Sequence, residues 1–129
     1  MSETQTQIPP SFYEGIRLFN QQDFYEAHEY FEDAWRQTFG DEREFFRALL
    51  QLSGGFYRLT QNRPEAARKF FAHAHKWLAL YPDNFHGFDI AQIRAYTDQL
   101  IKTIDEKTPP DEILQEQFQP MQPLDGPHQ

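Results

Sequence analysis

The sequence contains no cysteine among its 129 residues. A chain without thiols forms no disulfide, no thiolate metal site and no cysteine nucleophile, so the natural setting is a reducing cytoplasm. The first ten residues, MSETQTQIPP, also lack the basic flank and apolar run of a signal peptide. No stretch approaches the roughly 18 apolar residues that a membrane span requires. We therefore expect a soluble cytoplasmic protein with no membrane partner.

Basic residues are scarce as well. The chain has 12 Lys and Arg against 20 Asp and Glu, which gives a formal net charge of −8, and the basic residues are scattered among the acids. Such a surface repels phosphate backbones unless a basic patch is segregated. A nucleic-acid partner is therefore not expected.

Aromatic residues, in contrast, are abundant. They make up 16% of the chain and include 13 Phe, enough bulky apolar material for a core. The length suits one domain. We expect a flexible stretch at 1–10, a single helical domain at 11–106, and a proline-rich tail at 107–129 in which a short helix around 112–118 docks on the domain.

Helix starts give the clearest local signal. A capping side chain followed three residues later by Glu or Gln marks a helix N-terminus, because each side chain satisfies a backbone N–H group. Five such pairs precede segments of helical periodicity, at about 11–20, 24–38, 42–61, 63–80 and 90–106. The pairs are Ser11 with Glu14, Asp23 with Glu26, Asp41 with Glu44, Asn62 with Glu65, and Asp89 with Gln92. With no alternating strand pattern, the prediction is an all-α fold, a compact bundle of five main antiparallel helices.

The third predicted helix carries two apolar stripes, which is typical of a helix covered on two sides. Gly54 and Gly55 lie inside it, where each costs on the order of 1 kcal/mol relative to Ala, so we expect a neighbouring helix to approach closely there. The remaining strip, Arg47, Gln51 and Arg58, is either solvated or turned toward a site.

A weak internal repeat has an offset of 40 residues. Five positions match, at 19, 27, 30, 31 and 34 in the first copy and at 59, 67, 70, 71 and 74 in the second. The repeat indicates helix-hairpin character like that of tetratricopeptide repeats, although two copies are fewer than the three or so that stabilise a solenoid.

The second predicted helix carries the most unusual stretch, FYEAHEYFEDAWR, in which one histidine stands among aromatics and acids. With Phe24 at 0° on the helical period, His28 falls at the edge of the apolar arc near 40° and Glu32 follows near 80°. The other acids, Glu26, Glu29 and Asp33, fall between about 140° and 200°, on a solvated back face. Only His28 and Glu32 share a half-buried face.

Three interpretations of this pair compete. An imidazole and a carboxylate one turn apart can ligate one divalent metal ion, with further ligands from elsewhere. Alternatively, Glu32 hydrogen-bonds His28 in a purely structural polar notch. In the third interpretation the pair is a general acid or base tuned by partial burial.

His28, Glu32 and Trp35 also occupy the three fixed positions of an HxxxExxW pattern. This stretch resembles the signature of a bacterial and archaeal family known as domain of unknown function 309. The resemblance covers roughly residues 12–105, including RALLQLSGGFYRL in the middle helix. Two positions depart from the expected pattern, Arg58 in place of His and Ala66 in place of Gly. The resemblance implies a small α-helical protein with no assigned activity and a suspected metal site at His28 and Glu32.

The leading hypothesis is a divalent-metal or small-ligand site at His28 and Glu32, with hydrolysis as one candidate chemistry. Tyr25, Trp35 and Gln51 are the candidate pocket residues, and no catalytic residue or organic cofactor is assigned. The rival hypothesis is a noncatalytic interaction module that binds a protein partner or a second copy of itself, with His28 and Glu32 as a structural pair. Whether the protein is an enzyme stays open between the two.

Overall fold

Proline sets the start of three helices in the computed structural model, which describes residues 8–121. Helices α1 (Pro10–Asn20), α4 (Pro64–Leu78) and α6 (Pro110–Glu116) each begin with proline, whose fixed φ suits the first helical turn. The other helices are α2 (Phe24–Gln37), α3 (Arg43–Thr60) and α5 (Ile90–Asp105). The predicted all-α class is confirmed, and the five main helices lie within three residues of their predicted bounds.

The predicted capping pairs are wrong in four of five cases. Only Asp89 caps its helix, accepting a hydrogen bond from the N–H of Gln92 at 3.0 Å. The residues that precede α1, α2, α3 and α4 form no side-chain cap within the described chain. At α1 and α4 the helix starts at proline instead, so Ser11 lies inside α1 and Asn62 lies in the turn before α4.

A small β-hairpin was not predicted. Strands β1 (Asn84–Phe85) and β2 (Phe88–Asp89) pair antiparallel before α5, joined by His86 and Gly87 at φ 50° and 79°. Two positive φ angles are the requirement of the tight turn that matches strand twist. Strands of two residues are too short to display an alternating pattern, so no strand could be predicted there.

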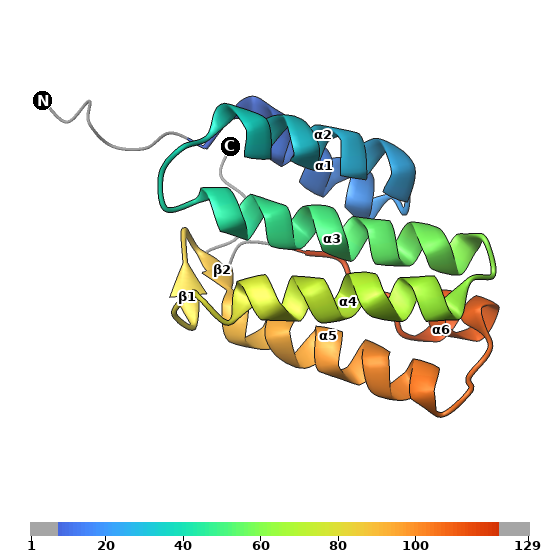
Figure 1. The fold of residues 1–129 in the computed structure, drawn as a ribbon. Helices are drawn as coiled ribbons and strands as arrows, with labels where there is room; N and C mark the ends of the chain where they lie inside the picture. Colours follow the sequence, from blue (N-terminus) through green and yellow to red (C-terminus); the bar gives the residue numbers. More distant parts are fainter. Residues whose placement is uncertain (1–7, 122–129) are drawn as a thin grey trace, which may run out of the picture.

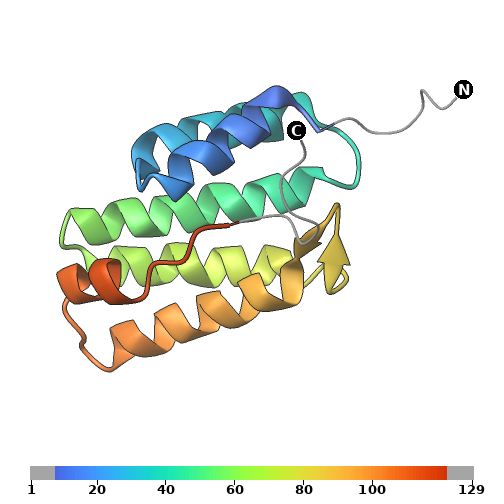
Figure 2. The ribbon, with the colours of Figure 1, turned by 180° about the vertical axis from the view of Figure 1, so that it is seen from behind.

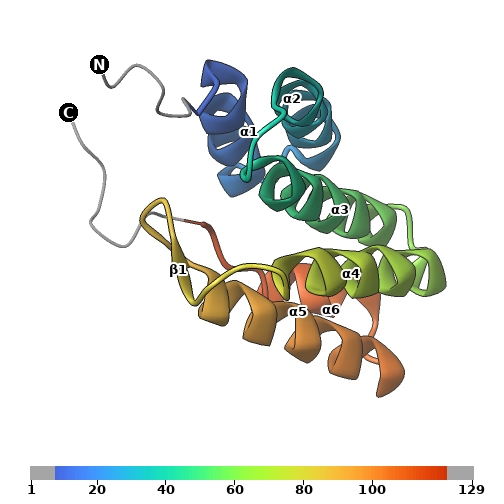
Figure 3. The ribbon, with the colours of Figure 1, turned by 60° about the vertical axis from the view of Figure 1, so that its left-hand side comes forward.

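Helix α3 is central, as predicted. It packs against α2 on one side and α4 on the other, while α1 covers α2 and α5 covers α4 (Figures 1 and 3). Seven phenylalanines from α1 to α4 are completely buried in the core. They are Phe12, Phe19, Phe31, Phe45, Phe46, Phe56 and Phe71.

The turns after α1, α3 and α5 have the same construction. Each contains a residue with a left-handed backbone, Gln22 at φ 64°, Asn62 at 59° and Lys107 at 69°. In each turn the following N–H donates to a carbonyl five residues back, which is the Schellman geometry that ends a helix. These bonds run from Asp23 to Leu18, from Arg63 to Arg58 and from Thr108 to Thr103. The described chain thus contains three like hairpins, one more than the sequence repeat suggests.

The first two hairpins also share their tightest helix contact. A Cβ on Gly15 would lie 2.7 Å from the ring of Phe31, and a Cβ on Gly55 would lie 2.4 Å from the ring of Phe71. The two glycines are 40 residues apart in the sequence, and so are the two phenylalanines. The predicted reason for a glycine at position 55, close approach of a neighbouring helix, is therefore confirmed.

The chain returns across the bundle after α6 (Figure 2). Ile113 of α6 is fully buried, and the Asn20 side chain exchanges two hydrogen bonds with the backbone of Met121, at 2.8 and 2.9 Å. Most of the stretch expected to be flexible at 1–10, and the end of the tail at 122–129, lie outside the described residues. None of the described helices is long and apolar enough to cross a membrane.

Candidate functional site

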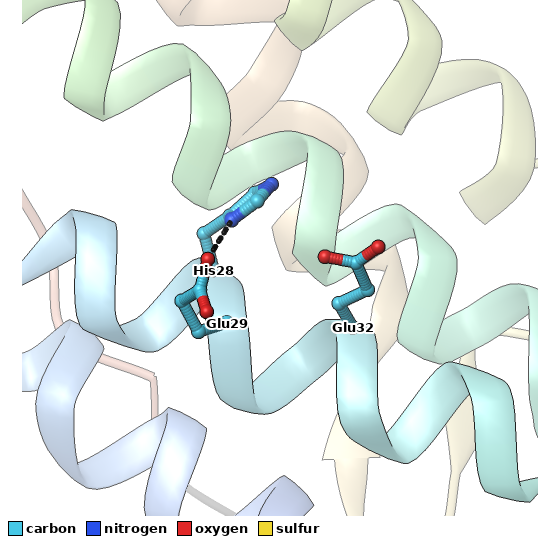
Figure 4. A group of neighbouring side chains, drawn as sticks. All are labelled: His28, Glu29 and Glu32. Carbon is cyan, nitrogen blue, oxygen red and sulfur yellow. Dashed lines mark ion pairs between the residues drawn. The ribbon is translucent and has the colours of Figure 1, made fainter.

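His28, Glu32 and Trp35 lie on the side of α2 that faces α3. Their spacing of four and three residues puts them one turn apart on one face. Phe24, Ala27, Phe31 and Ala34 bury the adjoining face of the same helix, which fixes the rotation of α2 against the core. Figure 4 shows the His28 ring and the Glu32 carboxylate side by side at the edge of α2.

Glu29 joins this pair, which was not predicted. One ligand atom from each of His28, Glu29 and Glu32 lies within 4.8 Å of the other two, a grouping able to hold a metal ion. His28 Nδ1 is 4.0 Å from Glu29 Oε2 (Figure 4). The side chain of Glu29 is 51% exposed, against 32% for His28 and 29% for Glu32. Glu29 is thus exposed, as predicted, yet its carboxylate lies beside the histidine.

The predicted structural pair is not formed. Glu32 accepts a hydrogen bond of 2.8 Å from Arg36, one turn further along α2. No hydrogen bond joins His28 to Glu32 within residues 8–121, and the buried His28 Nδ1 has no hydrogen-bond partner there. His28 and Arg36 both lie one turn from Glu32, and the carboxylate pairs with the arginine, which is permanently charged, rather than with a ring turned toward α3.

A hollow of about 90 Å³ borders His28 on the side of α3 and α4. Its walls are Tyr25, His28, Gly54, Tyr57, Arg58 and Phe70. Tyr25 packs on Tyr57 with ring centroids 5.3 Å apart, and Glu29 raises the pKa of Tyr25 by its negative charge and by hydrogen bonding. Of the predicted pocket residues, Tyr25 borders the hollow, whereas Trp35 and Gln51 do not.

Trp35 and Gln51 share a different property with His28. Trp35 Nε1 and Gln51 Oε1 are buried polar atoms that find no hydrogen-bond partner in the described part of the chain. Such atoms are uncommon in folded proteins, because each costs about 1–3 kcal/mol when left unpaired. Three of them therefore lie along the α2–α3 face, and two come from the HxxxExxW positions.

Arginines cover the Trp35 end of this face. The Arg43 guanidinium lies 4.4 Å from the Trp35 ring centroid, and that of Arg47 lies 5.3 Å from Trp35 and 4.4 Å from Trp77 of α4. Both arginines also pair with Glu44, at 3.5 and 3.4 Å. Cation–π stacking between two indoles explains why Arg47, predicted to be solvated or turned toward a site, is half-buried.

The second hairpin supplies an internal comparison. Forty residues after His28 and Trp35, helix α4 carries Arg68 and His75, which face α5. Arg68 makes a bidentate ion pair with Asp105, and His75 lies 3.3 Å from Asp98. The same positions are thus paired across the helix interface in the second hairpin and unpaired in the first. If His28 had a purely structural role, we would expect it to pair across the helix interface, as Arg68 does.

The other histidines that the structure describes stand apart from this site. His73 is exposed on α4, and His86 Nε2 lies 2.8 Å from the buried carboxylate of Glu42. Neither belongs to the grouping around His28. Among residues that the sequence did not assign to the site, Glu29 comes from α2 itself, next to His28, whereas the helix register between α2, α3 and α4 brings Tyr57 and Phe70 there.

The fold and the site define a small all-α protein of stacked helical hairpins with an HxxxExxW helix at its edge. Residues 12–70 match the sequence model of the family described as domain of unknown function (DUF309). This match confirms the family resemblance predicted from the HxxxExxW signature.

A relative from Aquifex aeolicus (strain VF5), described as an uncharacterized protein, is 30% identical over 99 residues. The match covers 76% of this chain and 30% of the relative, so the chain spans less than a third of that protein. The similarity extends beyond the family match without adding an activity.

Proposed function

We propose that this protein binds a divalent metal ion through His28, Glu29 and Glu32. The observation that carries the proposal is the convergence of one imidazole and two carboxylates within 4.8 Å on the exposed edge of α2. An imidazole nitrogen with carboxylate oxygens is a common ligand set for zinc and for other first-row divalent ions.

Binding requires a modest contraction of the group. Metal bonds of about 2.0–2.2 Å place neighbouring tetrahedral donors about 3.3–3.6 Å apart, closer than the present spread. Glu32 also has to release Arg36, a pair whose arginine is 67% exposed. An exposed ion pair contributes about 0–1 kcal/mol, so a metal ion can displace it at little cost.

The three ligands leave at least one coordination position open. An open position on zinc is the arrangement of catalytic sites, in which a bound water becomes acidic enough to attack a substrate. Hydrolysis is therefore the candidate chemistry, and the comparison with Arg68 supports a role for His28 beyond packing.

Metal content and thermal unfolding test the proposal. Protein purified without an affinity tag is analysed for metal, and its melting temperature is then measured with added zinc and manganese. We expect bound metal and a rise in melting temperature that His28→Ala and Glu32→Ala abolish. Asp33→Asn is the matched control, since Asp33 is an exposed acid of the same helix outside the group.

The outcomes separate the alternatives. A wild type with no metal and no metal-induced stabilisation sinks the proposal. If the alanine variants are folded but Asp33→Asn abolishes the effect equally, binding is nonspecific attraction to an acidic surface.

A protein-interaction role is the second candidate. It is favoured by the three stacked hairpins, an architecture that presents extended binding faces, and by Phe39, which is 89% exposed beside the start of α3. The partner is another protein or a second copy of this chain. We expect a pull-down to return a reproducible partner, or sedimentation to show self-association, and Phe39→Ser to weaken either. A protein that stays monomeric at high concentration and returns no reproducible partner would count against this role.

A further inference from the structure

The hollow beside His28 is lined largely by aromatic rings. Three of its six lining residues present aromatic rings, Tyr25, Tyr57 and Phe70. The Phe70 ring packs directly on Gly54 of α3, since a Cβ there would lie 2.9 Å from the ring. The volume of about 90 Å³ exceeds the roughly 10–15 Å³ that a single water needs, so several heavy atoms fit. A flat apolar body suits these walls.

Arg58 supplies a charge that no acid neutralises. Its guanidinium lies 5.6 Å from the Phe70 ring centroid and 5.7 Å from that of Tyr57, at the border of the hollow. Within residues 8–121 its side chain donates to the neutral Gln61 at 2.7 Å and has no ion pair, whereas Arg17, Arg36, Arg43, Arg47, Arg68 and Arg94 all pair with acids.

The other polar groups of the hollow are donors too. The imidazole of His28 and the phenol of Tyr57 each offer a hydrogen, whereas the phenol of Tyr25 is held by Glu29, and no carboxylate or side-chain amide oxygen belongs to the lining. A guanidinium surrounded by neutral donors is a setting for an oxyanion, which accepts charge-assisted hydrogen bonds.

We infer that this hollow binds the carboxylate of a small molecule with a flat apolar body, with Arg58 as its counter-ion. The inference deepens the proposed function and rests on it in one respect, because His28 borders both the hollow and the metal group. A carboxylate held by Arg58 would thus share His28 as a neighbour with the metal group.

Benzoate serves as the probe. Amide chemical shifts of isotope-labelled full-length protein are followed during titration with benzoate, with its neutral analogue benzamide, and with inorganic phosphate. We expect benzoate to move the amides of Gly54 and Tyr57 and to bind at least about tenfold more tightly than benzamide, the loss expected for one charge-assisted hydrogen bond. Arg58→Gln should weaken benzoate by a similar factor. Arg63→Gln should not weaken benzoate binding, because Arg63 lies beyond the end of α3 and outside the lining.

Several results would overturn the inference. These are equal affinity for benzoate and benzamide, shifts that map away from the hollow, unchanged binding in a folded Arg58→Gln, or a response to phosphate alone. Arg58→Lys keeps the positive charge and serves as a control in case Arg58→Gln does not fold. It should retain part of the affinity for benzoate. A zinc titration of the same samples separates the two proposals. Zinc binding without benzoate binding refutes this inference alone, whereas Arg58-dependent benzoate binding without zinc binding refutes only the metal site.

Discussion

Replacing His28 by phenylalanine should stabilise the metal-free protein. The substitution removes Nδ1, a buried atom that has no hydrogen-bond partner within residues 8–121. An unpaired buried polar atom costs about 1–3 kcal/mol, and the lower end applies here because the side chain is 32% exposed. The one additional ring atom of phenylalanine has room in the adjoining hollow of about 90 Å³.

The expected gain in the free energy of unfolding is about 1 kcal/mol, or roughly 4 °C in melting temperature for a domain of this size. Urea and thermal unfolding in the presence of a chelator measure it. Arg68→Met is the matched control at the equivalent position of the second hairpin, and it should change the stability little, because only its exposed pair with Asp105 is broken. A loss of 1 kcal/mol or more in a folded, metal-free His28→Phe would refute the reasoning and make His28 an ordinary core residue.

Three further outcomes test other parts of the structure. Gly55→Ala should destabilise by about 1–2 kcal/mol in urea unfolding, because overpacking against Phe71 outweighs the gain in helix propensity, and equal or higher stability would contradict the close contact. Burial raises the pKa of Tyr81 to about 12 while its hydroxyl accepts from the N–H of Phe45. Since the unfolded chain then loses that proton first, the contribution of Tyr81 to stability should be constant below about pH 10 and fall between pH 10 and 12, and Tyr81→Phe should flatten this alkaline decline in a pH series of melts. Glu29→Gln should weaken zinc binding by about tenfold in calorimetry while leaving stability within about 0.5 kcal/mol, since its side chain is half exposed, and unchanged zinc affinity would remove Glu29 from the site.

The helices could be predicted from sequence because their apolar periodicity is strong. The rotation of α2 also followed from periodicity, which is why His28 and Glu32 were assigned to one half-buried face. Whether a helix begins with a capping side chain or with proline was harder to predict. Ser11 and Pro10 both mark a helix start, and the structure shows that α1 begins at the proline. The hairpin at His86 and Gly87 is set by two backbone angles that leave no periodic trace.

The site was only partly predictable for a related reason. A helical wheel fixes where a Cβ points, but Glu29 has three further rotatable bonds and its carboxylate reaches His28 from the next position. The hollow depends on the register between three helices, which brings Arg58 and Phe70 to the same place from different elements. The third hairpin escaped notice because the turn at Lys107 repeats the backbone geometry of Gln22 and Asn62 without repeating their sequence.

Anomalous diffraction at the zinc edge from crystals grown with zinc tests whether α2 holds a metal ion. We expect one peak about 2.0–2.2 Å from a nitrogen of His28 and from carboxylate oxygens of Glu29 and Glu32, with Arg36 turned away from Glu32. A peak elsewhere, or density in which Glu32 still pairs with Arg36 and no metal lies beside His28, would contradict it.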